Sequence, residues 1–586
     1  RNLFIPTMTV NHLNATSNGA EAPKCRAAPI HANRKMRVIV IGAGASGIYM
    51  AYKLKYSFTD VVLDVYEKNS DIGGTWFENR YPGCACDVPA HNYTYSFEPK
   101  TDWSANYASS REIFTYFNDF LDKYDLRSYI SLRHEVIGAR WEEDKGQWVV
   151  QVRKHNGSIF EQCCDFVINA AGILNAWRWP PIPGIQSFKG QLLHSAAWDE
   201  SIDLTGKHVG LIGNGSSGIQ ILPQVQKVAK HVTTFIREPT WVSPTLGMEL
   251  HTYSEEEKKA FKEQPGLLLE MRKATEKAMG SVFPLLIKGS ETQVQNVAYM
   301  KEQMIKKLKN DELASKLIPE FALGCRRLTP GVNYLESLTL PNVTTIYGEI
   351  TKITPTGCVT ENGVETDLDV LICATGFDTT FKPRFPVLGR GGRNLQAEWE
   401  HEPRSYLGLA ASGFPNYFMF LGPNCPIGNG PIIFSIELQG SYIAEFLNRW
   451  QKEDIKAFDA KKEAVDDFME QKDLFMETTV WNTSCQSWYK NPKTGKITAL
   501  WPGSTLHYME TLAKPRYDDF DVTYASKNRF AYLGNGFSQR EMNPKADIAF
   551  YIREYDDGSS VFGDLFSTHN AKDYGDKLTT VARQAM

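Results

Sequence analysis

Two stretches of the chain carry glycines at a spacing that suits a dinucleotide phosphate. The candidate residues are Gly42, Gly44, Ser46 and Gly47 in the first stretch and Gly213, Gly215, Ser216, Ser217 and Gly218 in the second. Glycines at these places allow a tight turn and a close approach of the backbone to a pyrophosphate, and a following helix offers unpaired N–H groups to that anion. Two such stretches therefore predict two bound dinucleotides.

A charged residue follows each glycine stretch at nearly the same distance, and the two charges are opposite. Glu67 lies where a carboxylate can accept hydrogen bonds from ribose hydroxyls, whereas Arg237 holds the matching place in the second unit. The guanidinium of Arg237 suits a 2′-phosphate and favours NADPH over NADH. The neighbouring Glu238 argues the other way, because its carboxylate would repel that phosphate. FAD is expected at the first unit, where two-dinucleotide flavoproteins typically bind their flavin.

Two further motifs combine aromatic residues and glycines with one side chain able to carry charge. The first is a shaped loop, rich in Gly and Pro, with the candidates Gly74, Thr75, Trp76, Tyr81 and Asp87. The second lies between the two glycine stretches and consists of Phe188, Gly190, His194 and Trp198. The simplest interpretations are a solvated aspartate at Asp87 and a histidine that only fixes a linker at His194.

Three later features complete the set of candidates. Arg326 and Arg327 stand together, and for an isolated basic pair the default interpretation is a solvated surface. An apolar run ends in Ala-Thr-Gly, at Thr375 and Gly376. Trp488 is either ordinary core or part of a pocket.

Together these motifs resemble those of the type I Baeyer–Villiger monooxygenases, which use FAD and NADPH. The loop that ends at Asp87 matches one family signature at every fixed place, and the stretch that ends at Trp198 resembles the family fingerprint. Trp198 favours the ketone-oxidising branch, since related flavin monooxygenases usually have Tyr or Phe there. Ala171 departs slightly from the family, which often has Ala-Thr-Gly at that point. The resemblance covers most of the span from residue 35 to about residue 504.

The resemblance also implies roles for individual residues. Arg327 matches the catalytic arginine, and Asp87 would lie near the flavin and orient it. Arg326 matches a residue that helps to hold the 2′-phosphate. Trp488 matches a tryptophan that lines the nicotinamide and substrate pocket, and Thr375 ends a strand that returns the chain to the flavin domain.

The implied reaction is the insertion of oxygen beside a ketone. NADPH would reduce FAD, dioxygen would add to the flavin at C4a, and the deprotonated peroxide would attack the ketone and give an ester or lactone. Arg327 would stabilise that anion without giving up a proton. The length of the helical and aromatic segments is compatible with a bulky cyclic or polycyclic ketone as the substrate.

Two alternatives stay open at this point. An N- or S-hydroxylating flavin monooxygenase shares the two glycine stretches, and a non-catalytic protein could bind flavin and nucleotide alone. Whether His194 is catalytic or structural is also open.

The pattern of apolar residues predicts an α/β fold with two Rossmann-type dinucleotide-binding domains, one for FAD and one for NADP. Apolar, β-branched runs at 36–41, 61–66, 207–212 and 232–236 predict buried parallel strands. The predicted parts are an extended arm (1–35), the FAD domain in two pieces (36–185 and 381–586, the second with a C-terminal extension), a linker (186–205), the NADP domain in two pieces (206–250 and 324–380) and a helical insertion in it (251–323).

Composition excludes several other classes. The net charge of -4 and the absence of a long basic run argue against a nucleic-acid surface. No run reaches the ~18 apolar residues of a transmembrane helix, and no signal peptide is visible, so a cytoplasmic protein is expected. The sequence does not predict an oligomeric state.

The ten cysteines show neither a disulfide framework nor metal-ligand spacing. We therefore expect no metal site and ten reduced packing residues. This expectation argues against a flavin-dependent disulfide reductase, which needs a redox pair beside the flavin.

Overall fold

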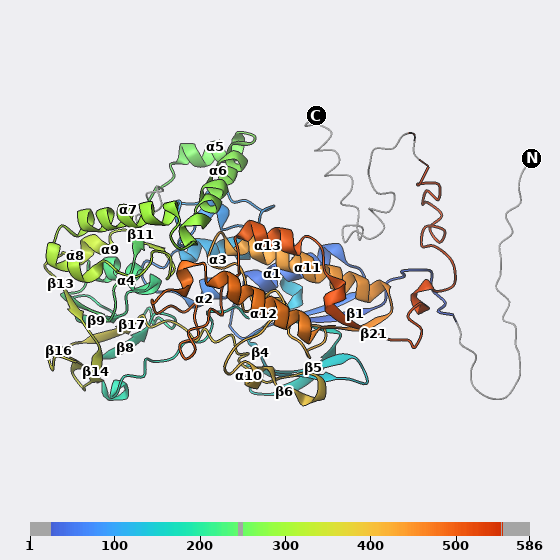
Figure 1. The fold of residues 1–586 in the computed structure, drawn as a ribbon, viewed down its shortest axis with the longest axis horizontal. Coiled ribbons are helices and arrows are strands. Elements are labelled where there is room, and N and C mark those ends of the chain that lie inside the picture. The colour runs from blue at the N-terminus through green and yellow to red at the C-terminus, as the bar shows by residue number, and fades with distance from the viewer. Residues whose placement is uncertain (1–24, 244–249, 553, 555–586) are drawn as a thin grey trace, which may run out of the picture.

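Two parallel sheets, each flanked by helices, form two lobes of an elongated molecule (Figure 1). This is a computed structural model, and it describes residues 25–243, 250–552 and 554. Residues 1–24 of the predicted arm (1–35) and residues 555–586 of the predicted C-terminal extension lie outside the described residues. The two sheets confirm the predicted α/β fold class.

The first lobe is built on a five-stranded parallel sheet in the order β19-β7-β1-β2-β3. Its strands are β1 (Met36–Ile41), β2 (Val61–Glu67), β3 (Ile130–Leu132), β7 (Phe166–Asn169) and β19 (Tyr417–Met419). Strand β1 is buried along almost its whole length, as expected for a central strand covered on both faces. Helices α1 (Ala45–Ser57) and α11 (Ile432–Lys452) pack against each other in this lobe. The strands predicted at 36–41 and 61–66 are thus confirmed.

The second lobe repeats this plan with the order β13-β10-β9-β17-β8. Its strands are β8 (Gln191–His194), β9 (His208–Ile212), β10 (His231–Ile236), β13 (Val343–Tyr347) and β17 (Val370–Cys373), and α4 (Ser216–Val225) follows β9. The strands predicted at 207–212 and 232–236 are confirmed. Part of the stretch expected as a linker forms β8, the edge strand of this sheet, which pairs with β17.

Four smaller sheets decorate the lobes. They contain β4 (His134–Glu142), β5 (Gln147–Lys154), β6 (Ile159–Cys164) and β18 (Val387–Leu388); β14 (Ile350–Ile353), β15 (Gly357–Thr360) and β16 (Glu365–Asp367); β11 (Val242–Ser243) and β12 (Thr329–Pro330); and β20 (Ile455–Ala460) and β21 (Phe520–Tyr524). The short pair β11–β12 matters most for the site, because it fixes the chain just after the arginine pair.

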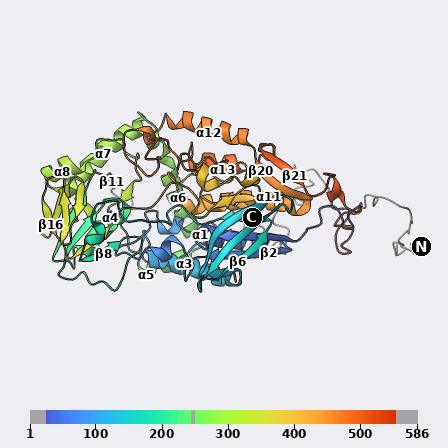
Figure 2. The same ribbon diagram turned by 90° about the horizontal axis from the view of Figure 1, so that it is seen from below.

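The remaining helices cover the sheets or project from them. They are α2 (Thr75–Glu78), α3 (Ser110–Lys123), α5 (Glu255–Glu263), α6 (Leu267–Ser281), α7 (Glu291–Leu308), α8 (Asp311–Leu317), α9 (Tyr334–Ser337), α10 (Leu395–Glu398), α12 (Lys462–Met476) and α13 (Thr505–Leu512). Figures 1 and 2 place α7 and α8 at the end of the molecule formed by the second lobe. Within the described ranges, no helix is long and apolar enough to cross a membrane.

The helical insertion docks on the first lobe through several contacts, among them those of one arginine. Arg272 of α6 donates from Nε to the carbonyl of His91 at 2.9 Å and from a terminal nitrogen to the carbonyl of Ser96 at 3.0 Å. In α7 the residues Met300 and Met304 are buried, so these methionines are packing residues. The insertion therefore bridges the two lobes on one side.

The two ends of the described chain pack against each other. Ile30 N donates to the carbonyl of Phe537 at 3.0 Å, and Asn535 N donates to the carbonyl of Ala28 at 2.9 Å. The rings of His31 and Tyr532 stack with centroids 5.4 Å apart. The extension thus covers the described part of the arm.

The expectation that all ten cysteines are reduced is wrong. Cys325 and Cys485 form a disulfide with Cα atoms 6.3 Å apart, a separation that a disulfide readily spans. The fold brings together two segments that are 160 positions apart in the sequence, and no sequence spacing signals such a pair. The argument against a disulfide reductase consequently no longer rests on the cysteines.

Candidate functional site

The first and last glycines of each stretch are required by the backbone. Gly42 has φ +99°, and a Cβ there would lie 2.8 Å from the carbonyl oxygen of Ala170. A Cβ on Gly47 would overlap the carbonyl oxygen of Gly42. Gly213 and Gly218 repeat both features in the second lobe. The turns and the close helix–strand packing of the two loops therefore depend on glycine.

The middle glycines face open space at the starts of two helices. Gly44 precedes α1 and Gly215 precedes α4, and neither helix has a side-chain cap on its first N–H groups. A Cβ on Gly215 would meet nothing within 4 Å, and one on Gly44 would come only as near as 3.6 Å to Gly74. Open helix N-termini of this kind attract phosphate. Both loops therefore fit a dinucleotide.

Glu67 lies at the carboxyl end of β2 and is almost fully buried. Its Oε2 accepts from Ala43 N at 2.8 Å and its Oε1 from Asn69 N at 2.9 Å. Burial raises the pKa of Glu67, and these two hydrogen bonds work against that rise. Each carboxylate oxygen has a second lone pair, so the group can still accept from a ribose.

In the second lobe, Arg237 is the accessible cation at the end of β10. Its side chain is 61% exposed, with one terminal nitrogen 4.0 Å from Glu349 and the other 3.3 Å from Oε1 of Gln486. The adjacent Glu238 is ion-paired with Arg326. This pairing removes the repulsion that the sequence suggested, because the charge of Glu238 is already neutralised.

Arg326 makes a different set of contacts from the predicted phosphate contact. Besides Glu238, it donates from Nε to the carbonyl of Gln486 at 2.5 Å and from a terminal nitrogen to the carbonyl of Pro239 at 3.1 Å. Its guanidinium also lies over the ring of Phe321, 4.8 Å from the centroid. In this arrangement Arg326 fastens two loops together, and Arg237 stays the more exposed of the two arginines.

Arg327 and Asp87 form a bidentate ion pair between the two lobes. Nε of Arg327 donates to one carboxylate oxygen at 2.5 Å and a terminal nitrogen donates to the other at 2.7 Å, while the remaining nitrogen lies 3.3 Å from the carbonyl of Ile427. Burial alone would raise the pKa of Asp87, but the charge and hydrogen bonds of Arg327 outweigh it and lower the pKa. Asp87 in turn raises the pKa of Arg327 despite burial. The Arg327 side chain keeps 35% of its surface exposed, so this permanent cation is still accessible to a ligand.

The loop that carries Asp87 is fixed against α4 of the second lobe. Tyr81 OH donates to Oε1 of Gln220 at 2.8 Å, and Nε2 of Gln220 donates to the carbonyl of Ala85 at 2.9 Å. Gly83 has φ +83°, and a Cβ there would lie 2.6 Å from the carbonyl oxygen of Gln220. The aromatic-Pro-Gly part of this motif is thus explained as a close contact between lobes.

The candidates Thr75 and Trp76 belong to α2, which begins directly after Gly74. Nε1 of Trp76 donates to Tyr93 OH at 3.2 Å, and their rings meet edge to face. Gly74 has φ +52° and its Cα lies near Gly44. These residues therefore border the first glycine loop.

The stretch from Phe188 to Trp198 anchors β8 to the rest of the second lobe. A Cβ on Gly190 would overlap the carbonyl oxygen of Asp369 and lie 2.6 Å from the ring of Phe188. Trp198 is partly buried and packs on the main core. This motif is therefore accounted for largely by packing.

His194 is fully buried at the end of β8. Its Nδ1 lies 3.1 Å from Ala196 N, which can only donate, so the proton is on Nε2, 3.3 Å from Oγ1 of Thr375. The ring stacks on Trp177 with centroids 4.5 Å apart. Burial lowers the pKa of His194 to about 4. These contacts favour the structural interpretation of His194, which ties β8 to the turn at Thr375 and Gly376.

Tyr489 is a site residue that sequence reasoning missed. It is buried and close enough to Arg327 to feel its charge, and its ring centroid lies 4.7 Å from that of Trp488. Burial raises the pKa of Tyr489, while the charge of Arg327 lowers it. Its position directly after Trp488 was the available signal, but a single tyrosine in an aromatic segment does not stand out. Trp488 itself is partly buried beside it.

The site thus holds a fixed, accessible cation between two glycine loops from different lobes. Asp87 comes from the first lobe, Arg327 follows the helical insertion of the second lobe, and Tyr489 comes from a late segment. An arrangement of this kind can stabilise negative charge that develops on a ligand held between two dinucleotides. Among the residues that the structure describes, no group of three or more His, Cys, Asp or Glu side chains could hold a metal ion.

Comparisons with known proteins agree with this picture. The family model described as flavin-binding monooxygenase-like matches residues 35–253. The FAD-binding monooxygenase moxY of Dothistroma septosporum is 38% identical over 550 residues, which are 92% of this chain and 88% of that protein. A Baeyer-Villiger monooxygenase of Pseudomonas aeruginosa is 32% identical over 522 residues, covering 87% of this chain and 95% of that protein. The crystal structure of the OTEMO complex with FAD and NADP has a TM-score of 0.74 at 28% identity and covers 83% of this chain and 99% of that chain.

Proposed function

Because the chain belongs to the flavoprotein monooxygenases that resemble the type I Baeyer–Villiger enzymes, we propose that it converts a ketone to an ester or lactone with NADPH and O2. The observation that carries the proposal is the bidentate pair between Arg327 and Asp87. It fixes a permanent, partly exposed cation where segments of the two lobes meet, which supports the proposal.

The cofactors of this enzyme are FAD and NADP. When bound, FAD supplies the electron transfer and the activation of dioxygen, and the protein supplies binding, orientation and electrostatics. The loop at Gly42–Gly47 and Glu67 would hold FAD. The loop at Gly213–Gly218 and Arg237 would hold NADP.

Arg327 would stabilise the anionic oxygen that attacks the ketone carbonyl. A guanidinium stays protonated in proteins, so it can stabilise an anion without quenching it by proton transfer. A fixed donor of this kind is typically worth about 3–4 kcal/mol of transition-state stabilisation. A hydroxylating enzyme would instead profit from a proton donor, which Arg327 cannot be.

Asp87 and Tyr489 would act on the reaction through Arg327. Asp87 accepts from two of the Arg327 nitrogens, and Tyr489 lies near enough to Arg327 for the charge of the guanidinium to act on its pKa. The carboxylate also offsets the cost of leaving a partly buried cation unpaired. We infer that both are positioning residues.

The preference for NADPH would come from Arg237. Its exposed guanidinium and the neutralised Glu238 favour a 2′-phosphate at this place. A cytoplasmic location stays a prediction.

The test is product analysis with a panel of linear, monocyclic and steroid-like ketones and one thioether. Ester or lactone formation that consumes NADPH and O2 in equal amounts supports the proposal. A sulfoxide as the only oxygenated product indicates the hydroxylating alternative. A yellow protein that consumes no NADPH in response to any substrate indicates a binding protein.

A further inference from the structure

The disulfide between Cys325 and Cys485 lies beside the arginine pair. Cys325 directly precedes Arg326 and Arg327, and Cys485 directly precedes Gln486. The other eight cysteines are free thiols, so this bond is not part of a wider framework. It links the segment that holds both arginines to the segment that holds Trp488.

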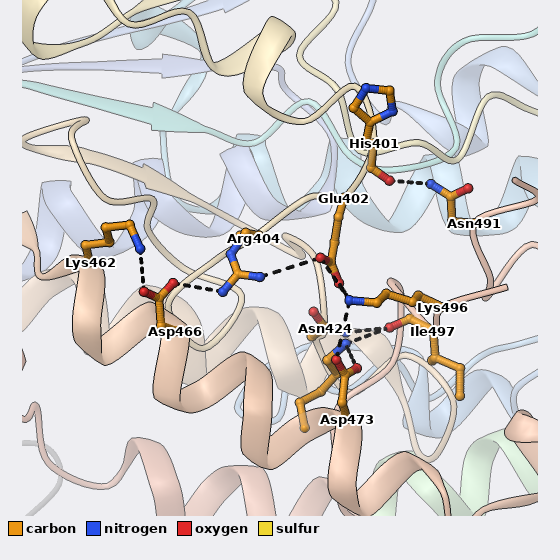
Figure 3. A network of polar contacts seen from close by, with 11 residues as sticks. His401, Glu402, Arg404, Asn424, Lys462, Asp466, Asp473, Asn491, Lys496 and Ile497 are labelled. Carbon is orange, nitrogen blue, oxygen red and sulfur yellow. Dashed lines mark hydrogen bonds and ion pairs between the residues drawn. The ribbon is translucent and has the colours of Figure 1, made fainter. Parts of the chain in front are cut away.

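The far end of the Trp488 segment is held by the polar network of Figure 3. Nζ of Lys496 lies 3.0 and 3.2 Å from the carboxylate oxygens of Glu402 and 3.7 Å from Asp473 on α12. Asn491 donates from Nδ2 to the carbonyl of His401 at 2.6 Å. Residues 491–497 are thus fixed to the first lobe without any help from the disulfide.

Residues 486–490 span the gap between these two anchors and lie beside both arginines. The carbonyl of Gln486 accepts from Nε of Arg326 at 2.5 Å, and the charge of Arg327 acts on the pKa of Tyr489. The side chain of Gln486 also reaches Arg237. Two cations of the proposed NADPH site, Arg237 and Arg326, therefore hydrogen-bond to this span through Gln486.

The two cysteines differ in their surroundings. Cys325 is fully buried, whereas Cys485, 6% exposed as a whole residue, stands in the chain between the exposed residues Ser484 and Gln486. Nζ of Lys490 lies 4.0 Å from Sγ of Cys325. An adjacent cation stabilises a thiolate, and a stabilised thiolate is the better leaving group in thiol–disulfide exchange. In thiol–disulfide exchange we therefore expect the incoming thiolate to attack Sγ of Cys485, with Sγ of Cys325 as the leaving group.

We propose that the Cys325–Cys485 disulfide is a reversible, thiol-sensitive tether that holds the Trp488 segment against the arginines and so sets the affinity for NADPH. The readout rests on the proposed NADPH dependence. The measurement does not depend on turnover of a ketone.

The exchange balances with a small dithiol as reductant. One thiolate of the dithiol attacks Sγ of Cys485, the S–S bond breaks, and its electron pair leaves with Sγ of Cys325 as a thiolate. The second thiol of the dithiol, as its thiolate, then attacks the mixed disulfide and releases Cys485 as a thiolate. The protein gains two electrons and two protons, and the dithiol ends as a cyclic disulfide.

The test compares oxidised and reduced holoenzyme after removal of the reductant. Dithiothreitol is the reductant, and alkylation under denaturing conditions followed by mass measurement counts the thiols, with eight expected before reduction and ten after. The affinity for NADPH is read from the concentration dependence of anaerobic flavin bleaching, without any ketone. We expect reduction to weaken it about tenfold, the effect of losing a hydrogen bond to a charged group, and oxidised dithiothreitol to restore it.

Two variants distinguish the loss of the Cys325–Cys485 disulfide from unspecific effects of dithiothreitol on the protein. C485S should have the weak affinity whether or not dithiothreitol has been used, whereas C163S, which removes an exposed free thiol, should behave like the wild type. Equal affinity in the oxidised and reduced wild type overturns the proposal, as do ten alkylated thiols in holoenzyme that has been exposed to oxidised dithiothreitol. If C485S does not fold, the NADPH affinities of the oxidised and the reduced wild type still test the proposal. A protein that binds NADPH in a redox-dependent way but makes no ester would refute the proposed reaction and not the tether.

Discussion

Arg326 donates to the carboxylate of Glu238, and this ion pair leaves the neighbouring Arg237 as the exposed cation at the end of β10. Arg237 was expected at the 2′-phosphate from its spacing after the second glycine stretch, and Arg326 from the family resemblance. In the structure Arg326 holds loops together, and Arg237 is exposed. This difference leads to a prediction about cofactor choice.

Arg237→Gln should raise the KM for NADPH about 10-fold to 100-fold and leave the KM for NADH unchanged. A guanidinium that contacts a 2′-phosphate makes charge-assisted hydrogen bonds, each worth about 1.5–3 kcal/mol. The measurement is initial-rate kinetics with both nucleotides. Since Arg237 is 61% exposed, its replacement should not change the melting temperature. Equal increases for both nucleotides would count against a phosphate contact.

Arg327→Lys should lower the rate of ester formation about 100-fold to 1000-fold while the flavin content stays normal. Lysine keeps the charge but cannot present two parallel N–H groups to Asp87 or hold a fixed orientation. Flavin content is measured by absorbance and product by gas chromatography. Normal ester formation in this variant would remove the central residue of the proposed mechanism.

Asp87→Asn should destabilise the protein by about 1–3 kcal/mol at neutral pH. This range lies below that for a fully buried ion pair, because solvent screens the partly exposed Arg327. Arg327 lowers the pKa of Asp87 below its ordinary value of 3.8. The stabilisation by the carboxylate is therefore complete above pH 3.8 and is lost as the pH falls through the lower, folded-state pKa. Urea unfolding of both proteins should show a constant difference at pH 5–8 that shrinks only below about pH 4. A difference that already fades at pH 6 would mean that another group titrates.

The glycine loops and the charges after them could be predicted because they depend on local chain geometry. Gly42 and Gly213 need positive φ, and the strand, turn and helix around each loop are contiguous in the sequence. The pairing of Arg327 with Asp87 was also expected, though from resemblance to a family and not from spacing. Local signals and family motifs thus cover the sheets and most of the candidate site.

The contacts that the sequence could not predict all join distant segments. Glu238 looked unfavourable for a 2′-phosphate because its partner, Arg326, lies on the far side of the helical insertion. Cys325 and Cys485 are 160 positions apart, a separation that signals no disulfide. Tyr489 lies near Arg327 only in the folded chain. Such pairs depend on tertiary packing, which residue spacing does not encode.

His194 should make the folded state less stable between pH 6.5 and 4. Burial lowers its pKa to about 4 from 6.5, so the unfolded chain binds a proton in this range that the folded chain does not. Stability is therefore complete above pH 6.5 and falls as the pH drops toward 4, by at most about 3 kcal/mol. Glutamine does not titrate, so His194→Gln should flatten this part of the curve of melting temperature against pH. His91, whose pKa burial also lowers to about 4, remains in both proteins. An unchanged slope would show that His194 does not stay neutral in the folded protein.

Gly190→Ala should destabilise the second lobe without touching either cofactor loop. The new Cβ would overlap the carbonyl oxygen of Asp369 and press on the ring of Phe188, so β8 or β17 has to shift. Overpacking of this kind typically costs about 1–3 kcal/mol. Differential scanning calorimetry should show a lower melting temperature. Gly280→Ala is the matched control, because a Cβ at this position in α6 meets nothing within 4 Å and alanine favours the helix. A drop of the same size in both variants would mean that the motif residue is not specially constrained, and the packing explanation of the Phe-x-Gly pattern would fail.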